Sequence, residues 1–336
     1  MMRAVVLVGG FGTRLRPLTY SVPKPMLLVG HVPIIERLIA NLVRGGVTDV
    51  TLALGFKPEP FLAAFPDGSC AGAQLRYAVE PEPLDTAGAI RFAADAAGID
   101  DTFIVANGDV LTDVDIAAMV AQHRAAAAEA TIHLIAVDDP SAFGVVALDA
   151  DARVTQFVEK PAPGTEPSNL INAGTYVLEA SVLERITPAQ KVSIERVTFP
   201  AMVAEGGVFG HPTDDYWVDT GKPEFYLMAN LDLVSGRRRG QTCLPVHPDA
   251  AVDVTAKLER SIVGTGAQVA AGAHIVDSVV LDGASIGDGA TVANSVVMGT
   301  VGARAQVAGC VIGADGSVGE GEHVVDERRP DQRRPN

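Results

Sequence analysis

The C-terminal third of the chain repeats a branched aliphatic residue every five or six positions, with glycine or alanine between. Hexad repeats of this kind predict short flat strands, three of which close one triangular coil of a parallel β-helix. A β-sandwich would need longer alternating strands and less regular glycine. We therefore expect a left-handed parallel β-helix of about four coils. The repeat positions are Val263, Val269, Ile275, Val280, Ile286, Val292, Val297, Val301, Val307, Ile312, Val318 and Val324.

The first 236 residues alternate short β-branched runs with longer helical periods, the pattern of βαβ units around a sheet. Ala4 to Val8 is typical of a buried central strand, and residues 33–43 place apolar side chains on one helical face. This predicts a doubly wound, mostly parallel α/β sheet. Further helices are expected over 86–97, 115–128 and 224–234, and further strands over 50–54, 103–106, 131–137, 153–159 and 172–178.

The composition changes at residues 235–240, Ser-Gly-Arg-Arg-Arg-Gly, which is typical of a linker. We predict an α/β domain over 1–236 and the β-helix over 237–325. The last segment, 326–336, carries four arginines and two prolines and has no apolar core residues, so a disordered tail is expected there.

Charge and cysteine content exclude several classes of protein. The 26 basic and 41 acidic residues give a net charge of -15, which would repel a phosphate backbone, so no nucleic-acid partner is expected. Three separated cysteines encode neither a disulfide framework nor a thiolate metal site. No apolar run approaches a signal or membrane-spanning length. A cytoplasmic protein without membrane contact is therefore predicted.

The most informative local segment runs from Leu7 to Thr19, L-V-G-G-F-G-T-R-L-R-P-L-T, and is followed by Pro23-Lys24-Pro25. Glycines at the end of a buried strand let backbone N–H groups approach an anion. A Rossmann fingerprint is excluded because Leu15 occupies the third glycine position, and no Gly-Lys-Ser/Thr completes a Walker A loop. A different phosphate-binding loop is indicated.

These two motifs resemble the signature of the sugar-nucleotide pyrophosphorylases, which are nucleotidyltransferases acting on sugar 1-phosphates. Further matches follow in order, and from about Arg3 to Val324 the pattern is most similar to the mannose-1-phosphate guanylyltransferases, which also carry a C-terminal β-helix. The resemblance implies transfer of a nucleoside monophosphate from a triphosphate, GTP foremost, to a sugar 1-phosphate. The further motifs are T-A-G at 86–88, N-G-D at 107–109, F-G-V at 143–145, F-V-E-K-P at 157–161, N-A-G at 172–174 and W-V-D-T-G at 217–221.

The resemblance also implies roles for individual residues. Arg14, Lys24 and Lys160 would be catalytic cations, and Asp109 and Asp219 would bind Mg²⁺, because oxygen ligands suit a hard cation. The sugar phosphate would meet Gly144, Glu159, Lys160, Asn172 and Gly174. The nucleotide would meet Leu7, Gly9, Gly10, Gly12, Thr13, Glu80, Asp85 and Gly88.

Two acidic residues bear on substrate identity. Guanine offers two adjacent N–H donors, and an ionised carboxylate is an acceptor with two oxygens, so Glu80 favours GTP. Asp85 stands where relatives usually carry glycine, in Leu84-Asp-Thr-Ala-Gly88. It either tolerates the backbone geometry of that glycine or hydrogen-bonds a hydroxyl group of an unusual substrate.

Alternatives remain open at the level of the sequence. Other triphosphates, glucose 1-phosphate or a cyclitol phosphate such as valienol 1-phosphate fit the same motifs. A catalytically silent regulatory subunit is a further alternative, although it would be expected to lack Lys24, Asp109 or Asp219, and all three are present. The β-helix histidines His274 and His323 are expected to be surface residues rather than an acyltransferase base. A homo-oligomer is expected.

Overall fold

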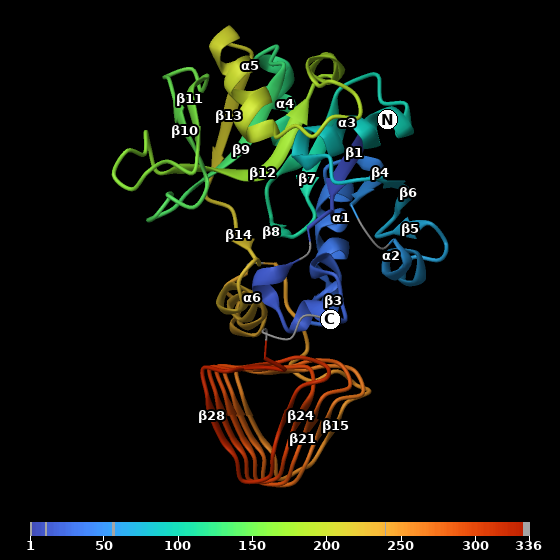
Figure 1. Cartoon of the computed structure of the whole chain (residues 1–336), viewed down its shortest axis with the longest axis vertical. Coiled ribbons are helices and arrows are strands. Elements are labelled where there is room, and N and C mark those ends of the chain that lie inside the picture. The colour runs from blue at the N-terminus through green and yellow to red at the C-terminus, as the bar shows by residue number, and fades with distance from the viewer. Residues whose placement is uncertain (1, 11, 56–57, 239, 332–336) are drawn as a thin grey trace. The chain divides into compact units, whose positions relative to one another are not determined.

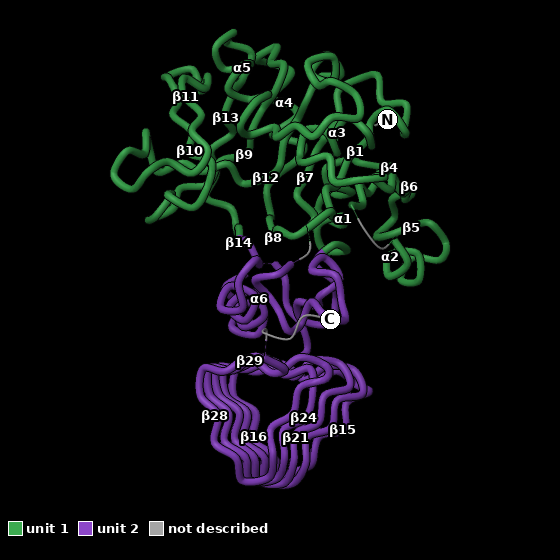
Figure 2. Tube along the Cα trace, viewed as in Figure 1, with its two compact units in different colours: residues 1–10, 35–217 green, residues 11–34, 218–336 purple. Residues whose placement is uncertain are grey.

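The computed structural model describes residues 2–10, 12–55, 58–238 and 240–331 (Figure 1). The chain forms two compact units (Figure 2). Unit 1 contains residues 1–10 and 35–217, and unit 2 contains residues 11–34 and 218–336. The predicted boundary at residue 236 therefore differs from the division into units, because 11–34 and 218–236 group with the β-helix. Where the independently folding domains end stays a prediction.

Unit 1 is built on one sheet whose central part is parallel. β7, β1, β4 and β6 are neighbours in that order and all run parallel, as the alternating sequence pattern predicts. β12 pairs antiparallel with β7 and β9, and β10 pairs antiparallel with β11 and β12. The strands of this sheet are β1 (Met2–Leu7), β4 (Val47–Leu54), β5 (Ser69–Cys70), β6 (Ala73–Val79), β7 (Phe103–Asn107), β9 (Ala130–Ala136), β10 (Gly144–Leu148), β11 (Val154–Glu159), β12 (Leu170–Leu178) and β13 (Val208–Thr213). β8 (Val110–Thr112) lies outside this sheet.

The helices of unit 1 form two groups, as expected for a doubly wound sheet. α3 and α5 share one apolar core with the sheet, whereas α1 and α4 contact each other, where Gly45 leaves no room for a Cβ beside Ile116. Burial of an apolar helical stripe is what stabilises each of them on the sheet. The helices are α1 (Ile34–Arg44), α2 (Glu59–Ala64), α3 (Asp85–Ala97), α4 (Ile116–Ala125) and α5 (Phe199–Glu205), with a 3-10 helix at Ala180–Arg185 and a π-helix at Ile194–Thr198.

In the first part of unit 2, residues 12–34 pack against α6 (Pro223–Ser235). The Tyr226 hydroxyl donates to the Leu28 carbonyl at 2.5 Å, and the Asn230 side chain accepts from the Gly30 N–H at 2.8 Å. Both side chains are buried, and these bonds to distant backbone explain why α6 groups with residues 11–34. This part of unit 2 contains 3-10 helices at Thr13–Leu15, Leu18–Tyr20 and Lys24–Met26, and the hairpin β2 (Leu28–Val29) and β3 (Val32–Pro33). It also contains the end of β14 (Trp217–Asp219), which precedes α6.

The rest of unit 2 is the parallel β-helix that the hexad repeat predicts (Figure 1). Each of its three sheets contains five parallel strands, one more coil than expected from the aliphatic repeat alone. The inward aliphatic residues form one buried core cluster. The three sheets are β15 (Ala251–Val252), β18 (Gln268–Val269), β21 (Ser285–Ile286), β24 (Thr300–Val301) and β27 (Ser317–Val318); β16 (Lys257–Glu259), β19 (His274–Val276), β22 (Thr291–Ala293), β25 (Gln306–Ala308) and β28 (His323–Val325); and β17 (Ile262–Val263), β20 (Val279–Val280), β23 (Val296–Val297), β26 (Val311–Ile312) and β29 (Arg328–Arg329).

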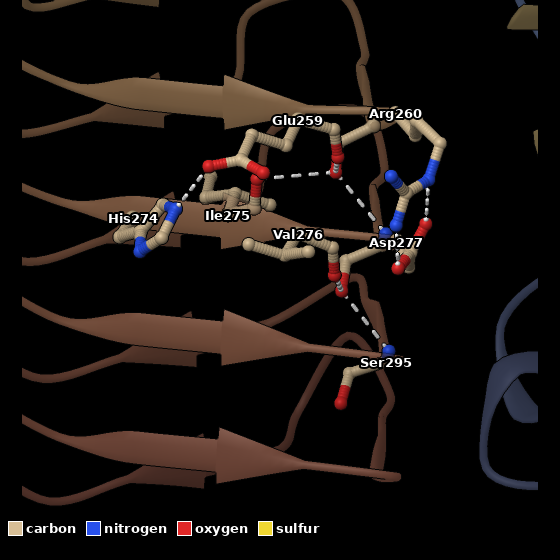
Figure 3. A network of polar contacts seen from close by, with 9 residues as sticks. Glu259, Arg260, His274, Ile275, Val276, Asp277 and Ser295 are labelled. Carbon is tan, nitrogen blue, oxygen red and sulfur yellow. Dashed lines mark hydrogen bonds and ion pairs between the residues drawn. The ribbon is translucent and has the colours of Figure 1, made fainter.

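One corner of the β-helix stacks a residue with positive φ in every coil. We call Arg260, Asp277, Asn294, Gly309 and Asp326 the corner column. Aspartate, asparagine and glycine tolerate this left-handed geometry better than other residues. Beside the column, each buried serine hydroxyl donates to a carbonyl two residues earlier and accepts the N–H of the next coil (Figure 3). This ladder satisfies buried backbone groups and fixes the register of the coils.

The last segment differs from the prediction of a disordered tail over 326–336. Residues 332–336 lie outside the described residues, but Arg328–Arg329 form β29 and pair with β26. The Gly313 N–H donates to the Arg329 carbonyl at 2.7 Å, and the Arg329 guanidinium pairs with Glu322 and Glu327. A charged segment is therefore ordered here because the β-helix supplies backbone partners and carboxylates.

Candidate active site

The glycine-rich loop begins at the end of β1, as predicted. The Leu7 carbonyl accepts the Gly108 N–H at 2.8 Å, which joins the loop to the Asn107-Gly-Asp109 turn after β7. A Cβ at Gly9 would meet Gly55 and the Glu80 side chain, whereas Gly10 has open space around it. A Cβ would thus fit at Gly9 in ordinary contact, and Gly10 leaves its backbone accessible to a ligand.

The next part of the loop lies in unit 2. Gly12 has φ +59, and a Cβ there would lie 2.9 Å from Thr19 Cγ2 and 3.2 Å from Lys24 Cβ. The Thr19 hydroxyl donates to the Gly12 carbonyl at 2.8 Å, and Thr13 starts a short 3-10 helix. Glycine is required at position 12 both for its left-handed backbone and for the approach of Lys24.

Lys24 and Arg14 meet at Asp219 within unit 2. The Lys24 ammonium lies 3.1 Å from Asp219 Oδ1, and the Arg14 guanidinium lies 3.9 Å from Asp219 Oδ2. Lys24 is buried and Arg14 is largely exposed. Gly221 donates its N–H to Asp219 Oδ1 at 2.9 Å, and a Cβ there would collide with Arg14. Two of the three predicted catalytic cations therefore share one predicted metal ligand.

Glu80 is buried in unit 1 between the start of the glycine loop and α3. Its Oε2 accepts the Leu84 N–H at 2.8 Å, and its Oε1 is the atom that a Cβ at Gly9 would meet. Burial raises the pKa of Glu80, and the Leu84 hydrogen bond opposes part of that shift. A buried acceptor beside the glycine loop is the environment that base recognition requires.

Asp85 has φ +59 at the first residue of α3. Its carboxylate accepts the Thr86 N–H at 2.9 Å. This is the left-handed geometry that a glycine would adopt freely, and a short polar side chain tolerates it through such a local bond. Of the two explanations offered for Asp85, the backbone explanation accounts for what the structure shows.

We expect Asp85→Gly to change the free energy of unfolding by less than about 0.5 kcal/mol, whereas Asp85→Ala lowers it by roughly 1–2 kcal/mol. Alanine keeps neither the left-handed tolerance nor the bond to Thr86. Urea denaturation of the two variants measures the difference. A loss of more than about tenfold in kcat/KM for Asp85→Gly would instead assign the carboxylate to the substrate.

Gly88 packs against a neighbouring segment rather than opening onto a cavity. A Cβ there would lie 2.5 Å from the Gln190 carbonyl, and the Gly88 N–H donates to the Val192 carbonyl at 3.2 Å. Glycine is needed at this position because residues 190–192 come too close to its backbone to leave room for a side chain. Direct contact of Gly88 with a nucleotide stays a prediction.

Asn107, the last residue of β7, lies beside Gly174. Gly174 has φ +79, and a Cβ there would lie 2.5 Å from Asn107 Nδ2. Asn172 Oδ1 accepts the Gly174 N–H at 3.0 Å, while Asn172 Nδ2 donates to the buried Tyr176 hydroxyl at 2.9 Å. The predicted sugar-phosphate residues 172 and 174 are therefore adjacent to the Asn-Gly-Asp turn, through Asn107.

Replacing Gly174 by alanine is expected to lower the free energy of unfolding by about 2–4 kcal/mol, from left-handed strain together with the collision with Asn107. Gly98→Ala is the matched control, because Gly98 has φ +63 and no atom near its missing Cβ. Thermal unfolding of both variants separates strain from collision. Equal losses would show that Asn107 moves away freely.

Of the remaining predicted sugar-phosphate residues, Gly144 begins β10, Glu159 ends β11, and Lys160 follows it. Gly144 pairs with Glu159, and a Cβ at Gly144 would lie 3.0 Å from Glu159 Oε2. The exposed Lys160 ammonium lies 3.7 Å from Glu159 Oε1, and Lys160 has φ +51. Burial and the charge of Glu195 raise the pKa of Glu159, and Lys160 opposes part of this.

Glu195 was missed by the sequence motifs. It lies in the π-helix Ile194–Thr198, and its Oε2 accepts from the hydroxyls of Thr86 and Ser193, both at 2.7 Å. Its hydrogen bond with Thr86 connects it to α3, and its negative charge contributes to the raised pKa of Glu159. π-Helices often occur at functional sites, but no sequence signal here distinguishes one from an α-helix.

The carboxylates fit a hard divalent cation in their chemistry. Asp219 is only partly buried, and its two oxygens already face Lys24, Arg14 and the Gly221 N–H. Among the described residues, no group of three or more acidic, histidine or cysteine side chains could hold a metal alone. Oxygen atoms of a phosphorylated substrate would complete such a site. Asp109 belongs to unit 1 and Asp219 to unit 2, so their pairing at one ion stays a prediction.

Comparisons with known proteins agree with the motifs. Residues 3–236 match the family model described as Nucleotidyl transferase, and residues 241–328 match that described as GMPPB C-terminal domain. Mannose-1-phosphate guanylyltransferase from Mycobacterium tuberculosis is 42% identical over 285 residues, covering 81% of this chain and 77% of the relative. A probable mannose-1-phosphate guanylyltransferase from Oryza sativa is 39% identical, covering 80% of this chain and 74% of the relative.

A solved structure shows the same fold. HddC from Yersinia pseudotuberculosis, crystallised with GMP-PN, is 30% identical and superimposes with a TM-score of 0.59. It covers 68% of this chain and 98% of its own length. In the described part of our chain, no helix is both long and apolar enough to span a bilayer.

Proposed function

The chain belongs to the nucleotidyl transferase family, and we propose that it transfers GMP from GTP to mannose 1-phosphate, with release of pyrophosphate. The observation that carries nucleotidyl transfer is the cluster of Lys24, Arg14 and Asp219 beside the glycine loop. The choice of GTP and of mannose 1-phosphate as the substrates rests on the relatives at 42% and 39% identity. Glu80 supports the choice of guanine.

In this reaction an oxygen of the sugar phosphate attacks the α-phosphorus of the triphosphate, and pyrophosphate leaves. Both substrates are polyanions, so positioning and charge neutralisation dominate catalysis. The backbone at Gly10 and the Lys24 and Arg14 side chains hold the triphosphate and stabilise charge that develops on the leaving pyrophosphate. Lys24 is held in place by Asp219, which limits the reorganisation needed when substrate binds.

On the acceptor side, Lys160 neutralises the sugar phosphate, and its exposure leaves the ammonium accessible. Glu159 and Asn172 provide hydrogen-bonding groups for sugar hydroxyls. Gly144 and Gly174 leave room for the side chains beside them, because a Cβ would collide with Phe157 and Glu159 at Gly144 and with Asn107 at Gly174.

Enzymes of this family use a divalent metal, and we propose Mg²⁺ held by Asp109 and Asp219. The ion would neutralise phosphate charge and orient the triphosphate. Asp219 would then serve both the ion and Lys24.

A substrate panel tests this function. The purified chain is incubated with Mg²⁺, each of GTP, ATP, UTP and dTTP, and each of mannose 1-phosphate, glucose 1-phosphate and valienol 1-phosphate, and pyrophosphate release is measured. GTP with mannose 1-phosphate is expected to give the highest kcat/KM. A faster rate with another pair would reassign the substrates, and no release with any pair would favour the regulatory-subunit alternative.

A cytoplasmic location and a homo-oligomer complete the proposal. Three separated cysteines, an odd number, suit a reducing compartment. The β-helix exposes flat strands and end coils, which are suitable for self-association. Light scattering of the full chain measures the mass.

A further inference from the structure

One short segment of unit 1 contacts both groups of predicted substrate residues. We call residues 190–199 the bridging segment, and it contains the π-helix Ile194–Thr198 and the first residue of α5, Phe199. Its first part lies against the start of α3, which carries predicted nucleotide residues. Its last part packs on β11 and β12, which carry predicted sugar-phosphate residues.

Backbone hydrogen bonds hold the first part of the bridging segment on α3. The Val192 N–H donates to the Leu84 carbonyl at 3.0 Å, and the Val192 carbonyl accepts the N–H of Ala87 at 2.8 Å. The Gly88 N–H donates to the same carbonyl at 3.2 Å. Val192 thus satisfies backbone groups at the start of a helix, where partners within the helix are lacking. These bonds involve backbone atoms alone, so side-chain substitutions leave their donors and acceptors in place.

The Thr86 side chain adds a connection that does depend on side chains. Its hydroxyl accepts the Ile194 N–H at 2.9 Å and donates to Glu195 Oε2 at 2.7 Å. The Ser193 hydroxyl donates to the same Glu195 oxygen, also at 2.7 Å. Thr86 and Glu195 are both half-buried. A hydrogen bond to an ionised carboxylate is stronger than one between neutral groups, so Thr86 fixes the position of Glu195.

The other end of the bridging segment reaches the acceptor side of the site. The Phe199 ring lies 5.6 Å from the Phe157 ring of β11 and 5.1 Å from the Tyr176 ring of β12, measured between centroids. Glu159 ends β11, two residues after Phe157. Burial raises the pKa of Glu159 and of Tyr176, and the negative charge of Glu195 raises both further. Glu195 is therefore close to the acceptor side as well as bonded to α3.

We propose that Glu195 is a positioning residue for the transfer reaction, and that its bond with Thr86 sets the place of Glu159 and Lys160 relative to the bound triphosphate. Reacting atoms must approach to about 3–3.5 Å, and a displacement of about 1 Å can cost up to about 100-fold in rate. Glu195 acts through Thr86 and the packing of the bridging segment, and not by contact with a substrate. The inference rests on the proposed function.

Thr86→Val tests the bond, because valine keeps the shape of the side chain and removes the hydroxyl. We expect kcat/KM for mannose 1-phosphate to fall about 10- to 100-fold, while the Kd for GTP, measured by calorimetry without acceptor, changes less than about threefold. The Kd is preserved because the backbone bonds of Val192 still hold the α3 turn. Thr86→Ser keeps the hydroxyl and should keep near wild-type activity. A Kd for GTP that rises as much as the acceptor kcat/KM falls would overturn the proposal.

Thr102→Val is the matched control for a purely structural effect. Thr102 is also half-buried in unit 1, and its hydroxyl donates to Glu179 Oε1 at 2.7 Å, the same length as the bond from Thr86 to Glu195. Both valine variants should lower Tm by a similar amount, whereas only Thr86→Val should lose activity. An equal loss of activity in the two variants would show general loosening of the fold and would contradict a positioning role.

Glu195→Gln and the double variant test whether the two side chains act as one unit. The amide keeps an acceptor oxygen for Thr86 but loses the charge, so kcat/KM for the acceptor should fall about 3- to 10-fold. Adding Glu195→Gln to Thr86→Val should cost little more than Thr86→Val alone, because both changes affect the same bond. Losses that multiply would show that Glu195 acts independently of Thr86, against the proposal.

The choice of substrates separates this inference from the proposed function. All variants are compared on the substrate pair that the wild type uses best. If that pair is not GTP with mannose 1-phosphate, the proposed function fails, and the contrast between Thr86→Val and Thr102→Val still tests Glu195. If it is that pair and the two variants are equally active, the function stands and the positioning role is absent. Without turnover on any pair, both proposals fail.

Discussion

Replacing Asp219 by asparagine is expected to lower kcat roughly 100- to 1,000-fold. The amide keeps the shape of the side chain and one acceptor oxygen for Lys24 and the Gly221 N–H, but it removes the negative charge. Lys24, a buried cation, then loses its ion pair with the Asp219 carboxylate, so the free energy of unfolding should fall by about 1–3 kcal/mol. Steady-state kinetics and urea denaturation measure the two effects.

The two effects have different origins, and controls separate them. Asp109→Asn should reduce kcat similarly, because it removes the other proposed metal ligand. Asp214→Asn, an exposed carboxylate in the same region of the sequence, should leave kcat unchanged. EDTA should abolish wild-type activity, and Mg²⁺ should restore it at a lower concentration in the wild type than in Asp219→Asn. Near-normal turnover of Asp219→Asn would remove Asp219 from the catalytic machinery.

The parallel half of unit 1 and the β-helix could be predicted from the sequence because both depend on short-range periodicity. Ala4 to Val8 is apolar throughout, as a strand covered on both faces must be, and the β-helix repeats its inward residue at a fixed interval. The repeat positions leave out three strands: β15 and β16 at the start of the β-helix, which carry Val252 and Leu258, and β29 at its end, where Arg328–Arg329 carry no aliphatic repeat residue. Ion pairs of Arg329 and backbone bonds order that strand instead.

The antiparallel strands and the composition of the units could not be predicted in the same way. Pairing of β12 with β7 and β9 is a choice among distant partners, and alternation within β12 does not specify it. Likewise, residues 11–34 group with α6 through single bonds such as Tyr226 to Leu28. These contacts join residues about 200 positions apart, and no local pattern reports them.

For the candidate site, the motifs predicted residue types better than contacts. Arg14, Lys24 and Asp219 were selected separately, as two cations and a metal ligand, whereas the structure joins them in one ion-pair cluster. Asp85 was recognised as a departure from the usual glycine, and its positive φ supplies the reason. Glu195 has no signature that separates it from ordinary polar residues, and Asn107 belongs to the N-G-D motif, which gave it no role of its own.

Glu80→Gln is expected to lower kcat/KM for GTP roughly 10- to 150-fold, and to lower it less, or raise it, for UTP and dTTP. An ionised carboxylate accepts both N–H donors of guanine, whereas an amide presents one acceptor and one donor, which suits uracil and thymine better. The glutamine still offers an oxygen to the Leu84 N–H, so the fold should be preserved. Competition between GTP and UTP for wild type and variant measures the change in preference.

The pH dependence of that preference separates recognition of the base from a structural role of Glu80. Burial raises the pKa of Glu80, so as the pH falls its carboxyl group protonates earlier than an exposed glutamate does. The protonated group has lost one acceptor, and kcat/KM for GTP should therefore fall on acidification in the wild type, at a pH above the range of an ordinary glutamate. Glu80→Gln has no such titration and should keep a constant ratio of GTP to UTP. If the ratio for the wild type is equally independent of pH, or if the variant keeps the wild-type preference, Glu80 supports the turn at Leu84 and does not read the base.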